Sequence, residues 1–241
     1  MKVIPAIDLM GGKVVRLSQG DPTTAKTYSY LGEPVTVAKK WEREGADALH
    51  VVDLDAAFDK GNNLAIIFKI AKAVNLPIQV GGGIRKLETA EKLLNTGIDY
   101  IILGTSAFNN PDVLTAIQNK FGSERVIVAL DHKNGKVMIE GWKTSVKLGI
   151  EEAMEKFLHL KIKTFLITSI TKDGTLKGLD FDTLSKACTH PGVRIIAAGG
   201  VGSLKDITAL KRIGVDGVVI GKALYEGLFT LKEALKAAKG D

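Results

Sequence analysis

Two aspartates, Asp8 and Asp131, stand at the same place in two similar stretches of sequence. Residues 6–14 read AIDLMGGKV and residues 129–137 read ALDHKNGKV, an offset (131 − 8 = 123) of about half the 241-residue chain. Each aspartate is expected to end an apolar strand, with a turn and a second short strand after it. Carboxylates that enter one site from two sides can serve as general acid and general base. The repeat therefore predicts proton-transfer chemistry in a two-fold symmetric site.

The repeat continues in a second motif that is rich in glycine. Gly82-Gly83-Ile84 recurs as Gly199-Gly200-Val201, and Gly104 recurs as Gly221 at the same offset of 117 residues. Glycines between a strand and a helix let backbone N–H groups and the helix N-terminus bind phosphate. We therefore expect two opposed phosphate sites. Their residues are Gly82, Gly83, Gly104 and Thr105 in one half, and Gly199, Gly200, Gly221 and Lys222 in the other.

Eight short β-branched strand patterns alternate with eight amphipathic helical patterns. The strands are expected at residues 3–7, 48–52, 78–80, 100–103, 125–130, 164–168, 193–197 and 217–220. The helices are expected at residues 34–44, 64–74, 87–94, 111–120, 150–159, 181–187, 204–213 and 223–238. This alternation over 241 residues predicts an α/β fold of the (β/α)₈ TIM-barrel type. We expect one domain over residues 1–241, made of duplicated half-barrels at about 1–122 and 123–241; an open doubly wound sheet is the alternative.

Side chains at the carboxyl ends of barrel strands carry the chemistry of such folds. Asp53 is also at a strand end, but we expect it to orient neighbours, because Thr168 takes its place in the other half. Residues 172–175 read KDGT, typical of a turn, and either reverse the chain or fold over a substrate, so Asp173 rivals Asp131 as an acid. Trp142 either stacks on a flat heterocycle or packs internally.

Composition narrows the class of protein. The net charge of +6 is spread without a basic block and aromatic content is only 6%, so nucleic acid is not an expected partner. No apolar run is long enough for a membrane helix. The single cysteine, Cys188, excludes an internal disulfide and indicates the cytoplasm. Scattered histidines and the lack of a Gly-x-Gly-x-x-Gly motif favour chemistry without metal or cofactor. A catalytically inactive phosphate-binding regulator is the weaker alternative.

Several motifs resemble one known family over the whole chain. They are residues 6–9 (AIDL), 12–17 (GKVVRL), 19–21 (QGD), 50–57 (HVVDLDAA), 81–85 (GGGIR), 141–142 (GW) and 173–176 (DGTL). They are similar to the histidine-biosynthesis isomerases that act on phosphoribosylformimino-5-aminoimidazole carboxamide ribotide. The first-strand phrase and the block at residues 50–57 are the most specific parts of this resemblance.

The resemblance implies an Amadori rearrangement of a bisphosphorylated ribotide, from aminoaldose to aminoketose, without metal or cofactor. Separately from the resemblance, we expect a monomer. It implies that Asp8 is the base that removes the C2 proton of the ribose. Asp131, assisted by Thr168, is then the acid that opens the ring, with Asp173 as the rival acid. The matched motifs also add substrate-binding residues, which are Arg16, His50, Arg85 and Trp142.

One departure from the isomerase pattern leaves two alternatives open. Residues 168–170 read TSI, which resembles the sister family of cyclases that make imidazole glycerol phosphate with a glutaminase partner. Those cyclases typically have a cysteine where Ile7 stands here, and they lack the block at residues 50–57. The cyclase subunit is therefore the runner-up, and a bifunctional isomerase that also acts on phosphoribosylanthranilate is the second alternative.

Overall fold

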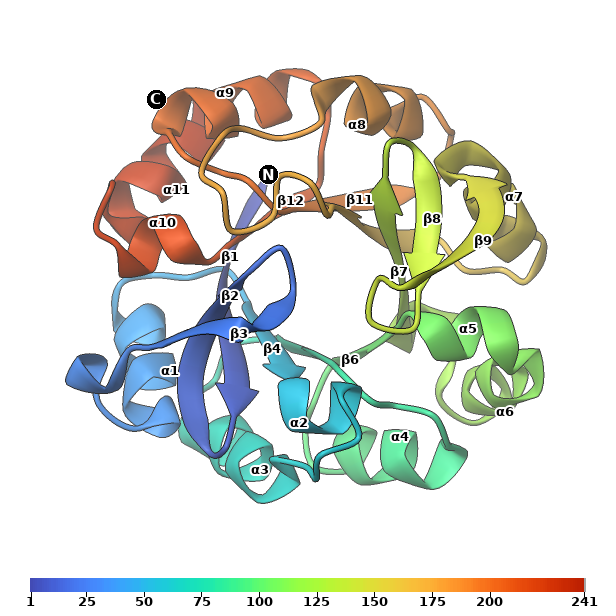
Figure 1. Cartoon of the computed structure of the whole chain (residues 1–241), viewed down its shortest axis with the longest axis horizontal. Helices are drawn as coiled ribbons and strands as arrows, with labels where there is room; N and C mark the ends of the chain where they lie inside the picture. Colours follow the sequence, from blue (N-terminus) through green and yellow to red (C-terminus); the bar gives the residue numbers. More distant parts are fainter. Residues whose placement is uncertain (241) are drawn as a thin grey trace.

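A closed barrel of eight parallel strands forms the centre of the molecule, in a computed structural model that describes residues 1–240 (Figure 1). The strands pair in the order β10-β11-β12-β1-β4-β5-β6-β7, and pairing of β7 with β10 closes the barrel. The expected barrel is confirmed, and the alternative of an open sheet is wrong. The barrel strands are β1 (Lys2–Met10), β4 (Leu49–Asp53), β5 (Ile78–Gly81), β6 (Tyr100–Leu103), β7 (Val126–Lys133), β10 (Thr164–Ser169), β11 (Arg194–Ala198) and β12 (Gly217–Ile220).

The two halves of the barrel begin in the same way. An antiparallel hairpin, β2 (Lys13–Ser18) and β3 (Asp21–Thr27), follows β1. A second hairpin, β8 (Lys136–Ile139) and β9 (Thr144–Gly149), follows β7. Both hairpins lie over the same end of the barrel (Figure 1).

The acids do not end their strands as expected. β1 continues past Asp8 to Met10, and β7 continues past Asp131 to Lys133. The reason is that the residues after each acid pair with the following strand of the hairpin, as Leu9 does with Val14. Each carboxylate therefore leaves the middle of a paired strand, which holds its backbone firmly.

An outer ring of helices covers the barrel (Figure 1). Each helix buries one face, as α1 does with Val37, Ala38 and Trp41. Among residues 1–240, none of the helices has the length and apolar character to cross a membrane. The outer helices are α1 (Pro34–Arg43), α3 (Leu64–Ala73), α4 (Leu87–Leu94), α6 (Pro111–Phe121), α7 (Ile150–His159), α8 (Phe181–Cys188), α9 (Leu204–Arg212) and α11 (Leu231–Lys239).

Three short helices follow strand ends on the hairpin side of the barrel: α2 (Leu54–Ala57), α5 (Thr105–Asn109) and α10 (Lys222–Tyr225). The single helix expected at residues 223–238 is wrong, because the chain breaks between α10 and α11. Gly227 has a φ of 70° there, and Thr230 starts α11 with a capping box. Its hydroxyl accepts from the Glu233 N–H while the Glu233 carboxylate accepts from the Thr230 N–H.

Side chains of alternate strand residues fill the barrel. The inward core consists of Ile4, Ala6, Ala48, Ile102, Ile127, Leu166, Ile196 and Val219. Because strand side chains alternate between faces, the next inward positions after Ala6, Ala129 and Leu166 are Asp8, Asp131 and Thr168. The apolar core thus ends one layer below the carboxylates and leaves them facing into the barrel mouth.

Candidate active site

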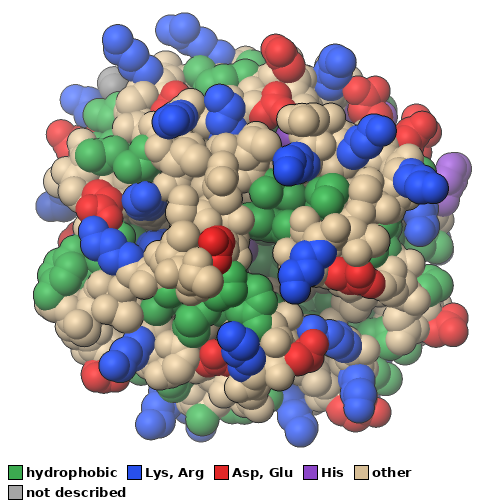
Figure 2. All heavy atoms as spheres, viewed as in Figure 1, with side chains coloured by type: hydrophobic (Ala, Val, Ile, Leu, Met, Phe, Trp, Pro, Cys, Tyr) green, Lys and Arg blue, Asp and Glu red, His purple; other side chains and the backbone are tan. Residues whose placement is uncertain are grey.

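A cavity of about 330 Å³ opens at the carboxyl ends of the barrel strands, a volume typical of small-molecule sites. Figure 2 shows the hollow near the centre of this face, with hydrophobic side chains around it. All the site residues expected from the sequence line this one cavity, and their individual roles stay predictions. They are Asp8, Arg16, His50, Gly82, Gly83, Arg85, Gly104, Thr105, Asp131, Trp142, Thr168, Asp173, Gly199, Gly200, Gly221 and Lys222.

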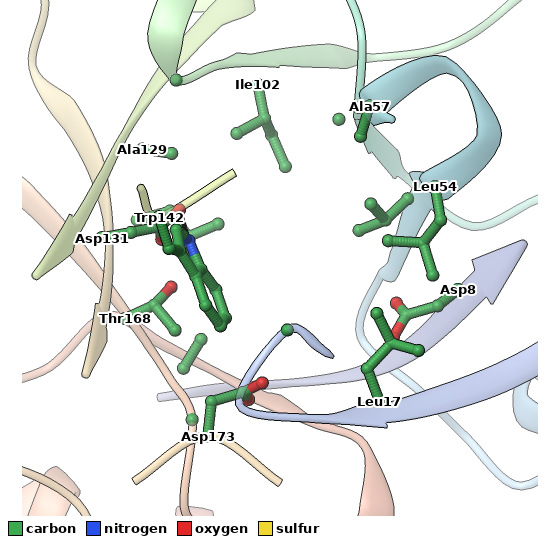
Figure 3. Close-up of a pocket in the computed structure, with 18 of the residues that line it drawn as sticks. Asp8, Leu17, Leu54, Ala57, Ile102, Ala129, Asp131, Trp142, Thr168 and Asp173 are labelled. Atoms are coloured by element: carbon green, nitrogen blue, oxygen red, sulfur yellow. Dashed lines mark hydrogen bonds between the residues drawn. The ribbon is translucent and has the colours of Figure 1, made fainter. Parts of the chain in front are cut away.

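Three carboxylates face the interior of the cavity from different sides. Figure 3 shows Asp8 and Asp131 on opposite walls, with Asp173 on a third side between them. Asp8 comes from β1 in the first half, Asp131 from β7 in the second half, and Asp173 from the turn after β10. A ligand in the cavity therefore has acidic groups on two opposite sides and on a third side between them.

The Asp8 carboxylate forms an ion pair with the Arg16 guanidinium on β2. Arg16 is only 8% exposed, and its second amino group donates to the Ala6 carbonyl. Burial, the largest single influence, would lower the pKa of Arg16, but the charge and hydrogen bond of Asp8, together with Tyr225 and Asp173, outweigh it and the pKa is raised. Asp8 is thus held beside a permanent positive charge.

The Asp131 carboxylate accepts a hydrogen bond of 2.8 Å from Nε1 of Trp142. Burial raises the pKa of Asp131, and hydrogen bonding by Trp142 and Thr168 opposes part of that rise. Trp142 also packs against Gly20 of the first hairpin, where a Cβ would lie 2.5 Å from the indole. The indole therefore packs between the halves as well as orienting Asp131, while its stacking on a ligand stays a prediction.

Asp173 lies in a tight turn, which is one of the two alternatives that the sequence left open. The backbone N–H groups of Lys172 and Asp173 both donate to the Ser169 carbonyl, and the Gln19 N–H donates to the Asp173 carbonyl at 3.1 Å. The turn thus rests on the first hairpin. Burial, together with the charges of Asp8 and Asp131, raises the pKa of Asp173 to about 7, although Arg16 opposes the rise. A carboxyl group with this pKa exchanges protons readily at neutral pH.

His50 is a neutral member of the cavity wall. Burial lowers its pKa to about 4, and its Nδ1 lies 2.9 Å from Nε2 of the buried Gln79. No sequence pattern singles out Gln79, because one amide inside a strand forms no motif. Asp53 orients its neighbours as expected: it accepts from the N–H groups of Ala56 and Asn63 and from the Asn63 side chain.

The paired glycines are required by backbone contacts alone. A Cβ on Gly82 would lie 2.3 Å from the Asp53 carbonyl oxygen, and one on Gly83 would lie 2.4 Å from that of Ala56. In the other half, a Cβ on Gly200 would lie 2.1 Å from the Gly178 oxygen. Their φ values are also positive, between 65° and 97°. Glycine is therefore required at these positions of the two expected phosphate sites, which we call the cradles, and their binding of phosphate stays a prediction.

The polar side chains of the cradles also brace the surrounding loops. Arg85 donates from Nη1 to the Ala56 carbonyl at 2.9 Å, and Lys222 donates from Nζ to the Gly174 carbonyl at 2.8 Å. The Thr105 hydroxyl accepts from the Glu140 N–H at 2.8 Å. Lys222 thereby connects the end of the eighth barrel strand to the turn that carries Asp173.

Fold and cavity together define a (β/α)₈ barrel of two matching halves, with a candidate acid/base site shared between them. The chain belongs to the family described as histidine biosynthesis protein, whose family model matches residues 2–230. This result confirms the family resemblance of the sequence motifs.

Curated relatives match nearly the full chain. Proteins from Nitrosopumilus maritimus and Methanocaldococcus jannaschii are 40% and 44% identical, over 97% and 99% of this chain and 98% and 100% of their own. A protein from Prochlorococcus marinus is 45% identical over 97% of this chain and 92% of its own. All three are named 1-(5-phosphoribosyl)-5-((5-phosphoribosylamino)methylideneamino) imidazole-4-carboxamide isomerase.

Proposed function

We propose that this chain is the isomerase of histidine biosynthesis whose name its relatives carry. It converts an N-linked phosphoribosyl aminoaldose into the aminoketose by an Amadori rearrangement, which is an intramolecular oxidation and reduction. One observation carries the proposal: acids from both half-barrels face a single cavity between two matched glycine cradles. The relatives reported above carry the isomerase name and give no support to the cyclase alternative.

The substrate that fits this arrangement is a long ribotide with a phosphate at each end. The cradle at Gly82 and Gly104 would hold one phosphate, and the cradle at Gly199 and Gly221 the other. The sugar would then lie between the cradles, near the carboxylates. The apolar wall residues Leu54 and Ile102 suit the flat heterocycle of such a substrate. We also propose that the enzyme works in the cytoplasm, a reducing compartment that suits a single free cysteine.

The proton transfers are assigned to the three carboxylates. Asp131, whose pKa is raised by burial, protonates the ring oxygen and opens the furanose. Asp8, paired with Arg16, removes the proton from C2 of the resulting iminium. The enol formed becomes the ketone when C1 takes up a proton and the C2 hydroxyl loses one. Asp173, with a pKa of about 7, is the second candidate for the acid.

The test is an isomerase assay on the purified chain, with and without ammonia and a glutaminase. We expect conversion of the aminoaldose without either addition. Asp8→Asn and Asp131→Asn should each lower kcat by about 10²-fold or more. A product that forms only with ammonia would replace the isomerase by the cyclase, and full activity in both variants would remove the acid/base assignment.

Binding of one phosphate by each cradle can be tested separately by thermal denaturation. A ligand that binds only the folded state raises the melting temperature in proportion to its affinity. The bisphosphorylated substrate should give a larger shift than ribose 5-phosphate at equal concentration. Equal shifts would mean that only one cradle binds phosphate.

A further inference from the structure

Tyr225 is a buried tyrosine of α10 that lies outside every motif of the sequence. It is 4% exposed, and its hydroxyl donates to the Ala6 carbonyl at 2.9 Å. Ala6 is the inward residue of β1 that immediately precedes Asp8 on the same face. The tyrosine therefore reaches from the end of the eighth barrel strand to the backbone that carries the candidate base.

The Arg16 guanidinium lies between this tyrosine and Asp8. Its Cζ is 4.9 Å from the centre of the Tyr225 ring, within the range of a cation–π contact. One amino group donates to the Ala6 carbonyl, which also accepts from Tyr225, and the other pairs with Asp8. The shared acceptor and the ring face leave the guanidinium little freedom to turn away from the carboxylate.

The Tyr225 ring is itself held by two further buried aromatic side chains. The Tyr28 ring lies 4.9 Å away and the Trp41 ring 5.7 Å away, nearly edge-on at 74°. Both residues are at most 2% exposed. On the other side, a Cβ on Gly221 would lie 2.7 Å from Arg16 Cζ, so the backbone of the cradle closes the remaining space.

We propose that Tyr225 is a positioning residue that holds Arg16 against Asp8 and thereby fixes the direction of the Asp8 carboxylate. This inference rests on the proposed function, in which Asp8 is the general base. Burial raises the pKa of Tyr225 to about 12, so its hydroxyl stays a donor throughout an ordinary assay range. The tyrosine acts only through Arg16 and the Ala6 carbonyl, and it is not itself a catalytic residue.

The predicted effect is on kcat and not on KM. If Arg16 turns away, the Asp8 carboxylate loses the partner that fixes its direction, so proton removal slows. A group that acts only on the proton transfer lowers kcat and kcat/KM equally and leaves KM nearly unchanged.

The experiment compares Tyr225→Leu and Tyr225→Phe with Tyr28→Phe. Tyr28 is a matched control because it is equally buried in the same cluster, but its hydroxyl donates to Glu226 and not to Ala6. For Tyr225→Leu we expect kcat to fall by about 10–100-fold with KM nearly unchanged. Tyr225→Phe keeps the ring face, and its kcat should fall by about 3–10-fold, whereas Tyr28→Phe should lower only the melting temperature.

A merely structural role would lower the melting temperature of the Tyr225 variants and leave their kcat and KM unchanged, which overturns the inference. If Tyr225→Leu does not fold, the comparison of Tyr225→Phe with Tyr28→Phe decides, since each removes one hydroxyl. Asp8→Asn separates this inference from the proposed function. An active Asp8→Asn overturns both, whereas an inactive Asp8→Asn beside an unchanged kcat in the Tyr225 variants overturns the positioning role alone.

Discussion

The indole of Trp142 donates a hydrogen bond to Oδ2 of Asp131 across 2.8 Å, and it does so from a residue with a φ of 69°. A bulky residue in this left-handed region is held there by its surroundings at a conformational cost. Here the surroundings include Gly20 of the opposite hairpin, which has no side chain to displace the ring. The position of Trp142 is thus set by both halves of the barrel and acts on the acidity of Asp131.

Replacing Trp142 by phenylalanine should shift the alkaline limb of the pH dependence of kcat/KM. The hydrogen bond favours ionised Asp131, so its loss raises the pKa of Asp131 further. If protonated Asp131 is the acid, the alkaline limb of kcat/KM moves up by about one pH unit, the size expected for one hydrogen bond to a charged group. A pH–rate profile of the purified variant measures this shift.

Thr168→Val removes the second hydrogen bond that opposes the rise in the pKa of Asp131. It should therefore also move the alkaline limb of kcat/KM to higher pH. If neither variant moves the limb, Asp131 is not the acid. The assignment then passes to Asp173, the other carboxyl group in the cavity with a raised pKa.

Asp173→Asn should make the protein more stable at pH 8 and leave its stability at pH 4 nearly unchanged. A carboxyl group whose pKa rises from 3.8 to about 7 on folding stabilises the fold when protonated. That contribution is complete below the unfolded pKa and is lost as the pH rises through 7. Asparagine is neutral at every pH, so the variant does not lose this stability as the pH rises. Each kcal/mol regained at pH 8 raises the melting temperature by about 2–4 °C.

Scanning calorimetry at the two pH values measures this difference. A variant with the same stability increment at pH 4 and pH 8 would show that ionisation of Asp173 does not strain the fold. The same measurement on Asp59→Asn, at an exposed carboxylate paired with Arg85, provides a control in which no gain is expected at pH 8.

The barrel and the content of the cavity were predictable from the sequence for a simple physical reason. Side chains alternate along a strand, so Asp8, Asp131 and Thr168 follow the apolar residues of the inward face. The repeat at an offset of about half the chain then placed these residues in two equivalent halves. The residues that lie at strand ends could be predicted from that position alone, without knowing the loop geometry.

The contacts that tune the site could not be predicted, because they depend on register and on loops. Arg16 reaches Asp8 only because the hairpin register places Asp8 opposite Val15. Tyr225 was expected inside one long helix, and its role became visible only when the structure broke that helix after α10. Gln79 touches His50 across neighbouring strands, a pairing that no local pattern reports.

The two main carboxylates should respond in opposite ways when their charge is removed. Asp8→Asn leaves the buried Arg16 without its counter-ion, which is expected to cost about 3–5 kcal/mol of unfolding free energy. Asp131→Asn removes a charge that burial disfavours, and the amide oxygen still accepts from Trp142. Its unfolding free energy at pH 8 should therefore equal or exceed that of the wild type.

Urea denaturation of both variants at pH 8 gives the comparison. Equal losses of unfolding free energy in the two variants would show that Arg16 finds another partner or that Asp131 is ionised without penalty. The measurement also separates activity lost by unfolding from activity lost with the acid group, because Asp131→Asn should lose activity and still be fully folded.

At the second cradle, the backbone of Gly200 lies close to that of Gly178. Two glycines of similar backbone conformation test how much this close approach matters. Gly200 has a φ of 97°, and a Cβ there would lie 2.1 Å from the Gly178 oxygen. Gly214 has a φ of 87° and no atom within 4 Å of a Cβ, so it reports the backbone strain alone. Gly214→Ala should cost about 1–2 kcal/mol, and Gly200→Ala about 1–3 kcal/mol more. Equal shifts in melting temperature would mean that the Gly178 loop can move aside, and that the cradle is not rigid.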